Sequence, residues 1–138
     1  MSLTALPHRP EPSGPYRPTI MQNLPLPSVT AAQRQACQQV RQITCNMFAE
    51  IVERDTVRRD RRHAMSHIRQ ISIYVCHVVL SLPLPEVAVC FGRDRSTVGL
   101  TCQHVEDRRD DPGFDAFVTA VEERCKSLVA LLEADAHD

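Results

Sequence analysis

The chain has 138 residues, of which 43% are hydrophobic and 24% are charged, and its formal net charge is −1. This length predicts one compact domain with flanking segments, and the hydrophobic fraction is enough for a core. A membrane-spanning helix needs about 20 consecutive apolar residues, but the longest candidate run is interrupted by Ser72, His77, Ser81 and Pro83. No apolar signal-peptide core is found near the N-terminus, so we expect a cytoplasmic protein.

The charges are unevenly distributed along the chain. Residues 34–104 contain ten arginines and six acidic residues, a balance of +4, whereas residues 105–138 contain ten acidic and four basic residues, a balance of −6. The sequence therefore predicts a basic module followed by an acidic tail. A basic module is compatible with nucleic-acid binding even though the net charge of the chain is close to zero.

Six cysteines suggest disulfides or a metal site, but their spacing argues against both. No two of them are spaced as a C-x-x-C pair; the six are Cys37, Cys45, Cys76, Cys90, Cys102 and Cys125. In a cytosolic chain such cysteines are typically small, reduced core residues. We therefore expect no metal and no other cofactor.

The first 27 residues contain seven of the ten prolines. Proline fixes the backbone and removes a hydrogen-bond donor, so residues 1–27 are predicted to be an extended or flexible arm. Two interpretations remain open for this arm, a flexible leader and a segment that docks onto a partner.

A long helix is predicted over residues 29–57, with Ser28 as its N-cap. Apolar residues at spacings of three and four predict a buried stripe, which comprises Val40, Ile43, Met47 and Ile51 and is widened by Phe48 and Val52. The early part of this helix, residues 31–39, is polar and is expected to project beyond the core.

The basic run Arg58-Arg59-Asp60-Arg61-Arg62-His63 is interpreted as a solvated loop or helix end before the next helix. That helix is predicted over residues 67–81, with Ser66 as its cap. Its apolar face comprises Ile68, Ile71, Val75, Val78 and Val79, with Tyr74 and Leu82 close to it. Arg69 and Gln70 then lie in its first turn, where a helix N-terminus favours phosphate.

Two short helices separated by a glycine-containing turn follow. The first is predicted over residues 84–91, with Pro85 in its first turn, where the missing N–H costs nothing. Gly92 permits the turn, and Asp94 can cap a second helix predicted over residues 97–109. Helix, turn and helix in this order are the layout of a helix-turn-helix, in which Val98 and Val105 are expected to face the core.

The segment Leu84-Pro85-Glu86-Val87, three residues, then Phe91-Gly92-Arg93-Asp94-Arg95-Ser96-Thr97-Val98 resembles the signature of the C-terminal DNA-binding domain of DnaA, the bacterial replication initiator. Arg69-Gln70 upstream and Cys102-Gln103-His104-Val105-Glu106 downstream extend the similarity over about residues 40–109. The resemblance implies an all-α fold like DnaA domain IV or the Trp repressor, with a long N-terminal helix. Residues 28–109 would form this domain.

The resemblance also implies contacts with double-stranded DNA. In the major groove, Asp94 can accept a hydrogen bond from cytosine and Arg95 can bind a guanine edge or a phosphate. Further phosphate or backbone contacts are implied for Arg69, Gln70, Pro85, Arg93, Ser96, Thr97 and His104; at His104 the family has a lysine. A threonine methyl group can also contact the methyl group of thymine. Arg61, with Arg62 beside it, is implied to enter the minor groove.

Residues 110–138 are predicted to form an acidic amphipathic C-terminal helix after the Asp110-Asp111-Pro112-Gly113 break. Its apolar stripe comprises Phe114, Phe117, Val118, Val121, Cys125, Leu128, Val129 and Leu132. This helix either closes the core or serves as a dimer or partner helix; the N-terminal region is a second candidate for homodimer contacts.

No phosphate loop of the form G-x-x-x-x-G-K-[ST] and no nucleophile–base set is found, so we do not expect an enzyme. The sequence predicts a stand-alone DNA-reading domain, without ATPase or unwinding activity, that binds sites like the DnaA box in the nucleoid. It would act as a transcriptional regulator or as a modulator of replication initiation. The alternative is a protein-interaction module of the replication or regulatory machinery that keeps the fold but not specific DNA reading.

Overall fold

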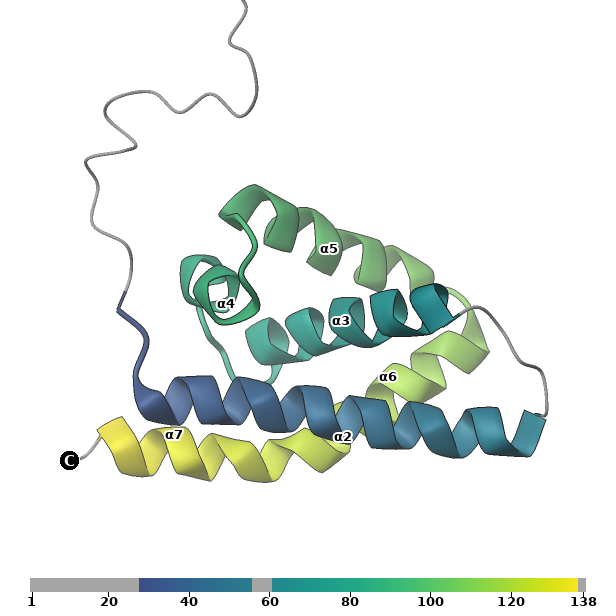
Figure 1. Ribbon diagram of the computed structural model, residues 1–138, viewed down its shortest axis with the longest axis horizontal. Helices are drawn as coiled ribbons and strands as arrows, with labels where there is room; N and C mark the ends of the chain where they lie inside the picture. Colours follow the sequence, from purple (N-terminus) through teal and green to yellow (C-terminus); the bar gives the residue numbers. More distant parts are fainter. Residues whose placement is uncertain (1–27, 56–60, 137–138) are drawn as a thin grey trace, which may run out of the picture.

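The computed structural model describes residues 28–55 and 61–136, and within these ranges all regular secondary structure is helical (Figure 1). The elements are α2 (Ala31–Asp55), α3 (Arg61–Val78), α4 (Leu84–Phe91), α5 (Arg95–Arg108), α6 (Pro112–Cys125), a short 3-10 helix η1 (Lys126–Leu128) and α7 (Val129–Ala136). The predicted all-α fold is confirmed. No helix in the described ranges has both the length and the apolar character that crossing a membrane requires.

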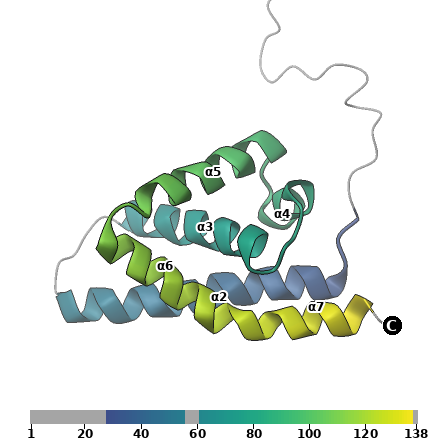
Figure 2. The ribbon, with the colours of Figure 1, turned by 180° about the vertical axis from the view of Figure 1, so that it is seen from behind.

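Helix α3 lies at the centre of the fold. It runs back over α2, and α4 and α5 lie on its other side, while α6 and α7 return along α2 (Figures 1 and 2). All six residues from 71 to 76 are buried, which means that neighbours surround α3 rather than cover one stripe of it. A helical segment that is buried on every side is apolar on every side. This explains the β-branched residues of α3, which would otherwise favour a strand.

Helix α2 begins two residues later than predicted, because Thr30 rather than Ser28 caps it. The Thr30 hydroxyl accepts a hydrogen bond from the Gln33 N–H at 3.0 Å, and the Gln33 side-chain oxygen accepts one from the Thr30 N–H at 2.9 Å. This reciprocal pair is a capping box. The predicted end of the helix at residue 57 lies outside the described residues.

The predicted burial of α2 is correct in its middle and wrong at both ends. Val40 and Met47 are buried and Ile43 is half-buried, but Ile51 is 42% exposed. The early part does not project beyond the core, because Ala36 and Cys37 are buried. Helices α4 and α7 pack against this end of α2 (Figure 2), so tertiary contacts cover a segment whose composition is polar.

Helix α3 begins at Arg61, six residues before the predicted start, and ends at Val78. Ser66 is therefore an interior residue and not a cap; its hydroxyl accepts a hydrogen bond from the Gln70 side chain at 3.3 Å. Arginine is a good helix former, and residues 61–63 of the basic run belong to α3, while residues 58–60 lie outside the described residues. The predicted apolar face is confirmed at Ile68, Ile71 and Val75, whereas Val78 is exposed.

The C-terminal segment forms two helices, α6 and α7, joined by η1, instead of one continuous helix. Asp111 caps α6 by accepting a hydrogen bond from the Phe114 N–H at 2.8 Å. The central part of the predicted apolar stripe is buried in the core, at Val118, Val121, Cys125 and Leu128. These side chains close the core of their own chain, so they are not available to a second copy.

The cysteines are distributed through this core as free thiols. Cys37, Cys76 and Cys125 are buried and the other three are half-buried. Burial raises the pKa of Cys125 to about 11 and also raises that of Cys102. Within residues 28–55 and 61–136, no three His, Cys, Asp or Glu side chains are grouped as a metal ion would require.

Candidate nucleic-acid interface

The turn between α4 and α5 is built around Gly92. Its φ of 64° and ψ of 36° are left-handed, a conformation that glycine adopts without penalty. The Arg93 N–H donates to the Ala88 carbonyl at 3.0 Å and the Gly92 N–H donates to the Val89 carbonyl at 3.4 Å, so α4 ends in a Schellman motif. Helix α4 therefore stops sharply, and the chain turns directly into α5.

Asp94 caps α5, as predicted. Its carboxylate accepts a hydrogen bond from the Thr97 N–H at 2.8 Å, and the Val98 N–H donates to its carbonyl at 3.1 Å. Because of this cap, α5 begins at Arg95, two residues before the predicted start, and it ends at Arg108. The exposed residues Arg95, Ser96 and Thr97 thus form the N-terminal turn of a helix, where the positive end of the helix dipole favours an anion.

The cap makes a testable contribution to stability. We expect Asp94→Ala to lower the free energy of unfolding by about 1 kcal/mol, because it removes the partner of the Thr97 N–H. Asp94→Asn is the matched control, since asparagine caps helices about as well as aspartate. Chemical denaturation followed by circular dichroism measures both; equal losses in the two variants would show that the charge, not the cap, is what stabilises the fold.

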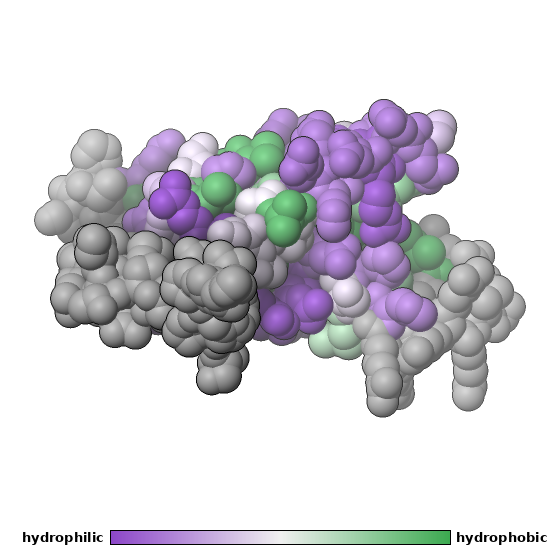
Figure 3. All heavy atoms as spheres, turned by 90° about the horizontal axis from the view of Figure 1, so that it is seen from above, coloured by the Kyte–Doolittle hydropathy of each residue, from purple (hydrophilic) through white to green (hydrophobic). Residues whose placement is uncertain are grey.

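Two buried valines set the orientation of α5. Val98 and Val105 are fully buried, as predicted, and a β-carbon placed on Gly99 would lie 3.7 Å from Leu84 of α4. The opposite face is therefore exposed. It carries Ser96, Thr97, Gln103 and His104, and Arg93 and Arg95 in and after the turn are exposed with it. Seen from above, the described part of this side of the molecule is mostly hydrophilic (Figure 3).

The C-terminal end of α5 is held by Arg109, which the sequence analysis did not single out. Its guanidinium donates to three residues of α6, namely Asp115 at 2.6 Å, Thr119 at 2.8 Å and Glu122 at 3.1 Å. It also donates to the Tyr74 hydroxyl of α3 at 3.2 Å, and that hydroxyl donates to Glu106 at 2.5 Å. One half-buried arginine thus connects α5 to two other helices.

A sequence signal for this network exists. Asp115, Thr119 and Glu122 recur at spacings of four and three, which places them on one face of α6. The C-terminal segment was predicted only to be acidic and amphipathic, and two of its acidic residues, Asp115 and Glu122, pair with Arg109. Burial, with the hydrogen bond to Glu106, raises the pKa of Tyr74 above its ordinary value.

The predicted position of Arg69 and Gln70 in a first helical turn is wrong. Arg69 and Gln70 are half-buried residues of the third turn of α3, not of its first turn, because the helix starts at Arg61. The argument from a helix N-terminus therefore does not apply to them. It applies instead to Arg61 and Arg62, which occupy the first turn; their side chains, and the residues Arg58 and Arg59, lie outside the described structure.

The residues predicted to contact DNA in the first turn of α3 and around the Gly92 turn lie near the two ends of α5. Arg108 donates to the His67 ring at 3.0 Å, so the N-terminal part of α3 lies beside the C-terminal end of α5. The first turn of α3 and the Gly92 turn are therefore near opposite ends of α5 (Figure 1). A helix of this length spans about 20 Å.

Pro85 is half-buried in the first turn of α4, as predicted.

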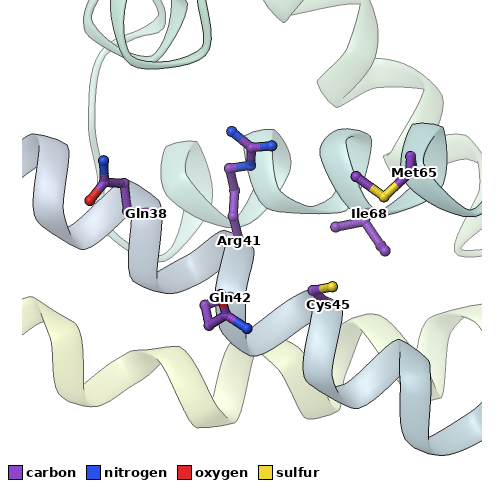
Figure 4. Close-up of a pocket in the computed structure, with 6 residues that line it drawn as sticks. All are labelled: Gln38, Arg41, Gln42, Cys45, Met65 and Ile68. Carbon is purple, nitrogen blue, oxygen red and sulfur yellow. The ribbon is translucent and has the colours of Figure 1, made fainter.

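A hollow between α2 and α3 contains no arrangement of catalytic groups. Its lining has no acidic residue and no histidine (Figure 4), and it comprises Gln38, Arg41, Gln42, Cys45, Met65 and Ile68. General acid–base or nucleophilic chemistry needs a titratable pair at hydrogen-bond distance. This hollow supplies none.

A family model for the bacterial DnaA protein helix-turn-helix matches residues 34–105, which is more than half of the chain. The chain belongs to this family. No curated protein and no solved structure is found to match it. The resemblance seen in the Leu84–Val98 residues is thus confirmed over a segment that extends from the first turns of α2 to the last buried residue of α5.

Membership in the DnaA helix-turn-helix family means that this is a DNA-binding domain whose partner is double-stranded DNA. The helix-turn-helix is a binding element and not a catalytic one. In such a motif the second helix, here α5, is the one that enters the major groove. Helices α6 and α7 lie outside the matched residues, although they complete the core on which α5 rests.

Proposed function

We propose that the chain binds double-stranded DNA at sites like the DnaA box and acts there as a transcriptional regulator or as a modulator of replication initiation. The observation that carries this proposal is the exposed run Arg93-Asp94-Arg95-Ser96-Thr97, presented on the turn and at the capped start of α5. The site of action is the nucleoid.

In the proposed complex, the N-terminal turn of α5 contacts base edges in the major groove. Arg95 forms a bidentate pair with a guanine edge, and Asp94, while capping the helix, accepts from a cytosine amino group. Arg93, Ser96, Thr97 and His104 contact phosphates. All six side chains are exposed, so this assignment requires no rearrangement of the core.

A second set of contacts is proposed at the other end of α5. Arg61, with Arg62 beside it, would enter the adjacent minor groove. A narrow minor groove has a negative electrostatic potential that attracts guanidinium groups. Arg69 and Gln70 of α3 and Pro85 of α4 would support the phosphate backbone between the two grooves. The separation of about 20 Å along α5 suits two contacts on successive grooves of one duplex.

Residues 28–109 provide these contacts in the proposal, and residues 110–138 support them from behind. We propose no ATPase or unwinding step, because the 138 residues contain no phosphate-loop motif of the form G-x-x-x-x-G-K-[ST].

A homodimer through the C-terminal or N-terminal region would increase avidity for paired sites. Sedimentation with and without a duplex that carries two sites tests for this homodimer.

Binding to a duplex that contains the nine-base-pair DnaA box, compared with a scrambled duplex of equal length and composition, tests the proposal. Fluorescence anisotropy at one fixed, physiological salt concentration is the measurement, because phosphate contacts make affinity strongly salt-dependent. We expect the box to bind roughly 10³-fold more tightly, as specific sites usually do. Equal binding to both duplexes contradicts box recognition, and binding to neither supports the interaction-module alternative.

A further inference from the structure

One large apolar side chain lies among the polar residues of the exposed α5 face. Leu100 is 57% exposed, the highest value for any large hydrophobic residue in the described parts of the chain. Single exposed leucines are common on protein surfaces and need no explanation by themselves. What distinguishes Leu100 is its position in the helix.

The helical register places Leu100 in the middle of the candidate DNA-binding face. Ser96 lies four residues before it and His104 four residues after it, while Thr97 and Gln103 lie three residues away on either side. Residues three and four apart are neighbours on one helix face. All four of these residues are exposed, and three of them, Ser96, Thr97 and His104, are proposed to contact DNA.

The packing of α5 also turns Leu100 away from the protein. The preceding residue, Gly99, faces α4, where an added β-carbon would meet Leu84 at 3.7 Å. One residue further along a helix is rotated by about 100°, which takes Leu100 off that contact and towards solvent. An alkyl side chain in this position has no core to join within its own chain.

We propose that Leu100 is a specificity-determining residue that contacts the C5-methyl group of a thymine. This inference rests on the proposed function. Of the groups that base pairs display in the major groove, the thymine methyl is the apolar one. A leucine among hydrogen-bonding neighbours would therefore discriminate thymine from cytosine, which occupies the same kind of position but carries no methyl group. This reading adds an apolar contact to the polar ones assigned to Asp94 and Arg95.

Replacement of thymine by deoxyuracil removes this methyl group and nothing else. The experiment measures binding of the full chain to the box-containing duplex, with each thymine replaced by deoxyuracil in turn. We expect one position at which the replacement weakens binding about fourfold, the size expected for one buried methyl group. The Leu100→Ala variant should lose a similar factor on the unmodified duplex and show no further loss with deoxyuracil at that position.

The matched control is Leu131→Ala, which truncates another exposed leucine on α7, outside the α5 face. It should retain the full penalty for deoxyuracil, and circular dichroism melting checks that both variants are folded. A Leu100→Ala protein that keeps the same penalty at every thymine overturns the inference while leaving specific binding intact. Absence of any preference for the box in the wild-type protein overturns the proposed function and this inference together.

Discussion

The substitution Val121→Asp in α6 is expected to abolish cooperative folding. Val121 is fully buried in the core, in the part of the chain that returns over α2. A carboxylate placed there without a partner is one of the few changes that cost more than about 4–5 kcal/mol. Because domains are stable by only about 5–15 kcal/mol in total, most or all of the folded population should be lost.

The neighbouring residue provides the matched control. Ala120 precedes Val121 on the same helix but is exposed, so Ala120→Asp adds the same charge to α6 without burying it. We expect it to change the free energy of unfolding by less than about 0.5–1 kcal/mol. Urea denaturation followed by circular dichroism compares the two. If both variants unfold at the same urea concentration as the wild-type protein, α6 is not part of the core.

Val121 matters for DNA binding because α6, to which it belongs, also holds the C-terminal end of the recognition helix α5. The family match ends at residue 105, yet Arg109 ties the end of α5 to Asp115 and Glu122 of α6. Helix α5 is thus held at both ends, by the Asp94 cap and the Gly92 turn at its start and by Arg109 at its end. Pre-ordering a recognition element lowers the entropic cost of binding.

The helix-turn-helix was predictable from the sequence because local chemistry specifies it. Pro85 at a first turn, Gly92 at a left-handed position and Asp94 as a cap each act within three or four residues. These signals predicted both ends of α4 correctly and the start of α5 to within two residues. The same signals carried the resemblance to the DnaA domain, which the family match supports.

The errors have two sources: contacts distant in sequence that override local composition, and local helix propensity that extends a helix past a candidate cap. Residues 31–39 look solvent-facing in the sequence, but α4 and α7 bury Ala36 and Cys37. Ser66 has the chemistry of a cap, but the arginines before it extend the helix to Arg61. Arg109 was not singled out because its partners belong to two other helices, α3 and α6, and the spacing of the α6 partners does not by itself identify the cation that they bind.

The substitution Arg95→Ala is expected to weaken binding to the box by about 1–3 kcal/mol, or about 5- to 150-fold. Arg95 is exposed in the first turn of α5, and its guanidinium is the one we assign to a guanine edge. Loss of a bidentate base contact should also reduce discrimination against a duplex with that base pair changed. The matched control is Arg124→Ala, which removes an exposed arginine on α6 away from the turn and should leave affinity unchanged.

A third variant decides whether Arg95 contacts a base or a phosphate. Arg95→Lys keeps the positive charge but lacks the planar fork that a guanine edge requires. If Arg95 reads guanine, the lysine variant should keep the dependence of affinity on salt while it loses discrimination between the two duplexes. If Arg95 holds a phosphate, the lysine variant should bind and discriminate like the wild-type protein. An alanine variant with unchanged affinity at matched salt would mean that Arg95 contacts neither group.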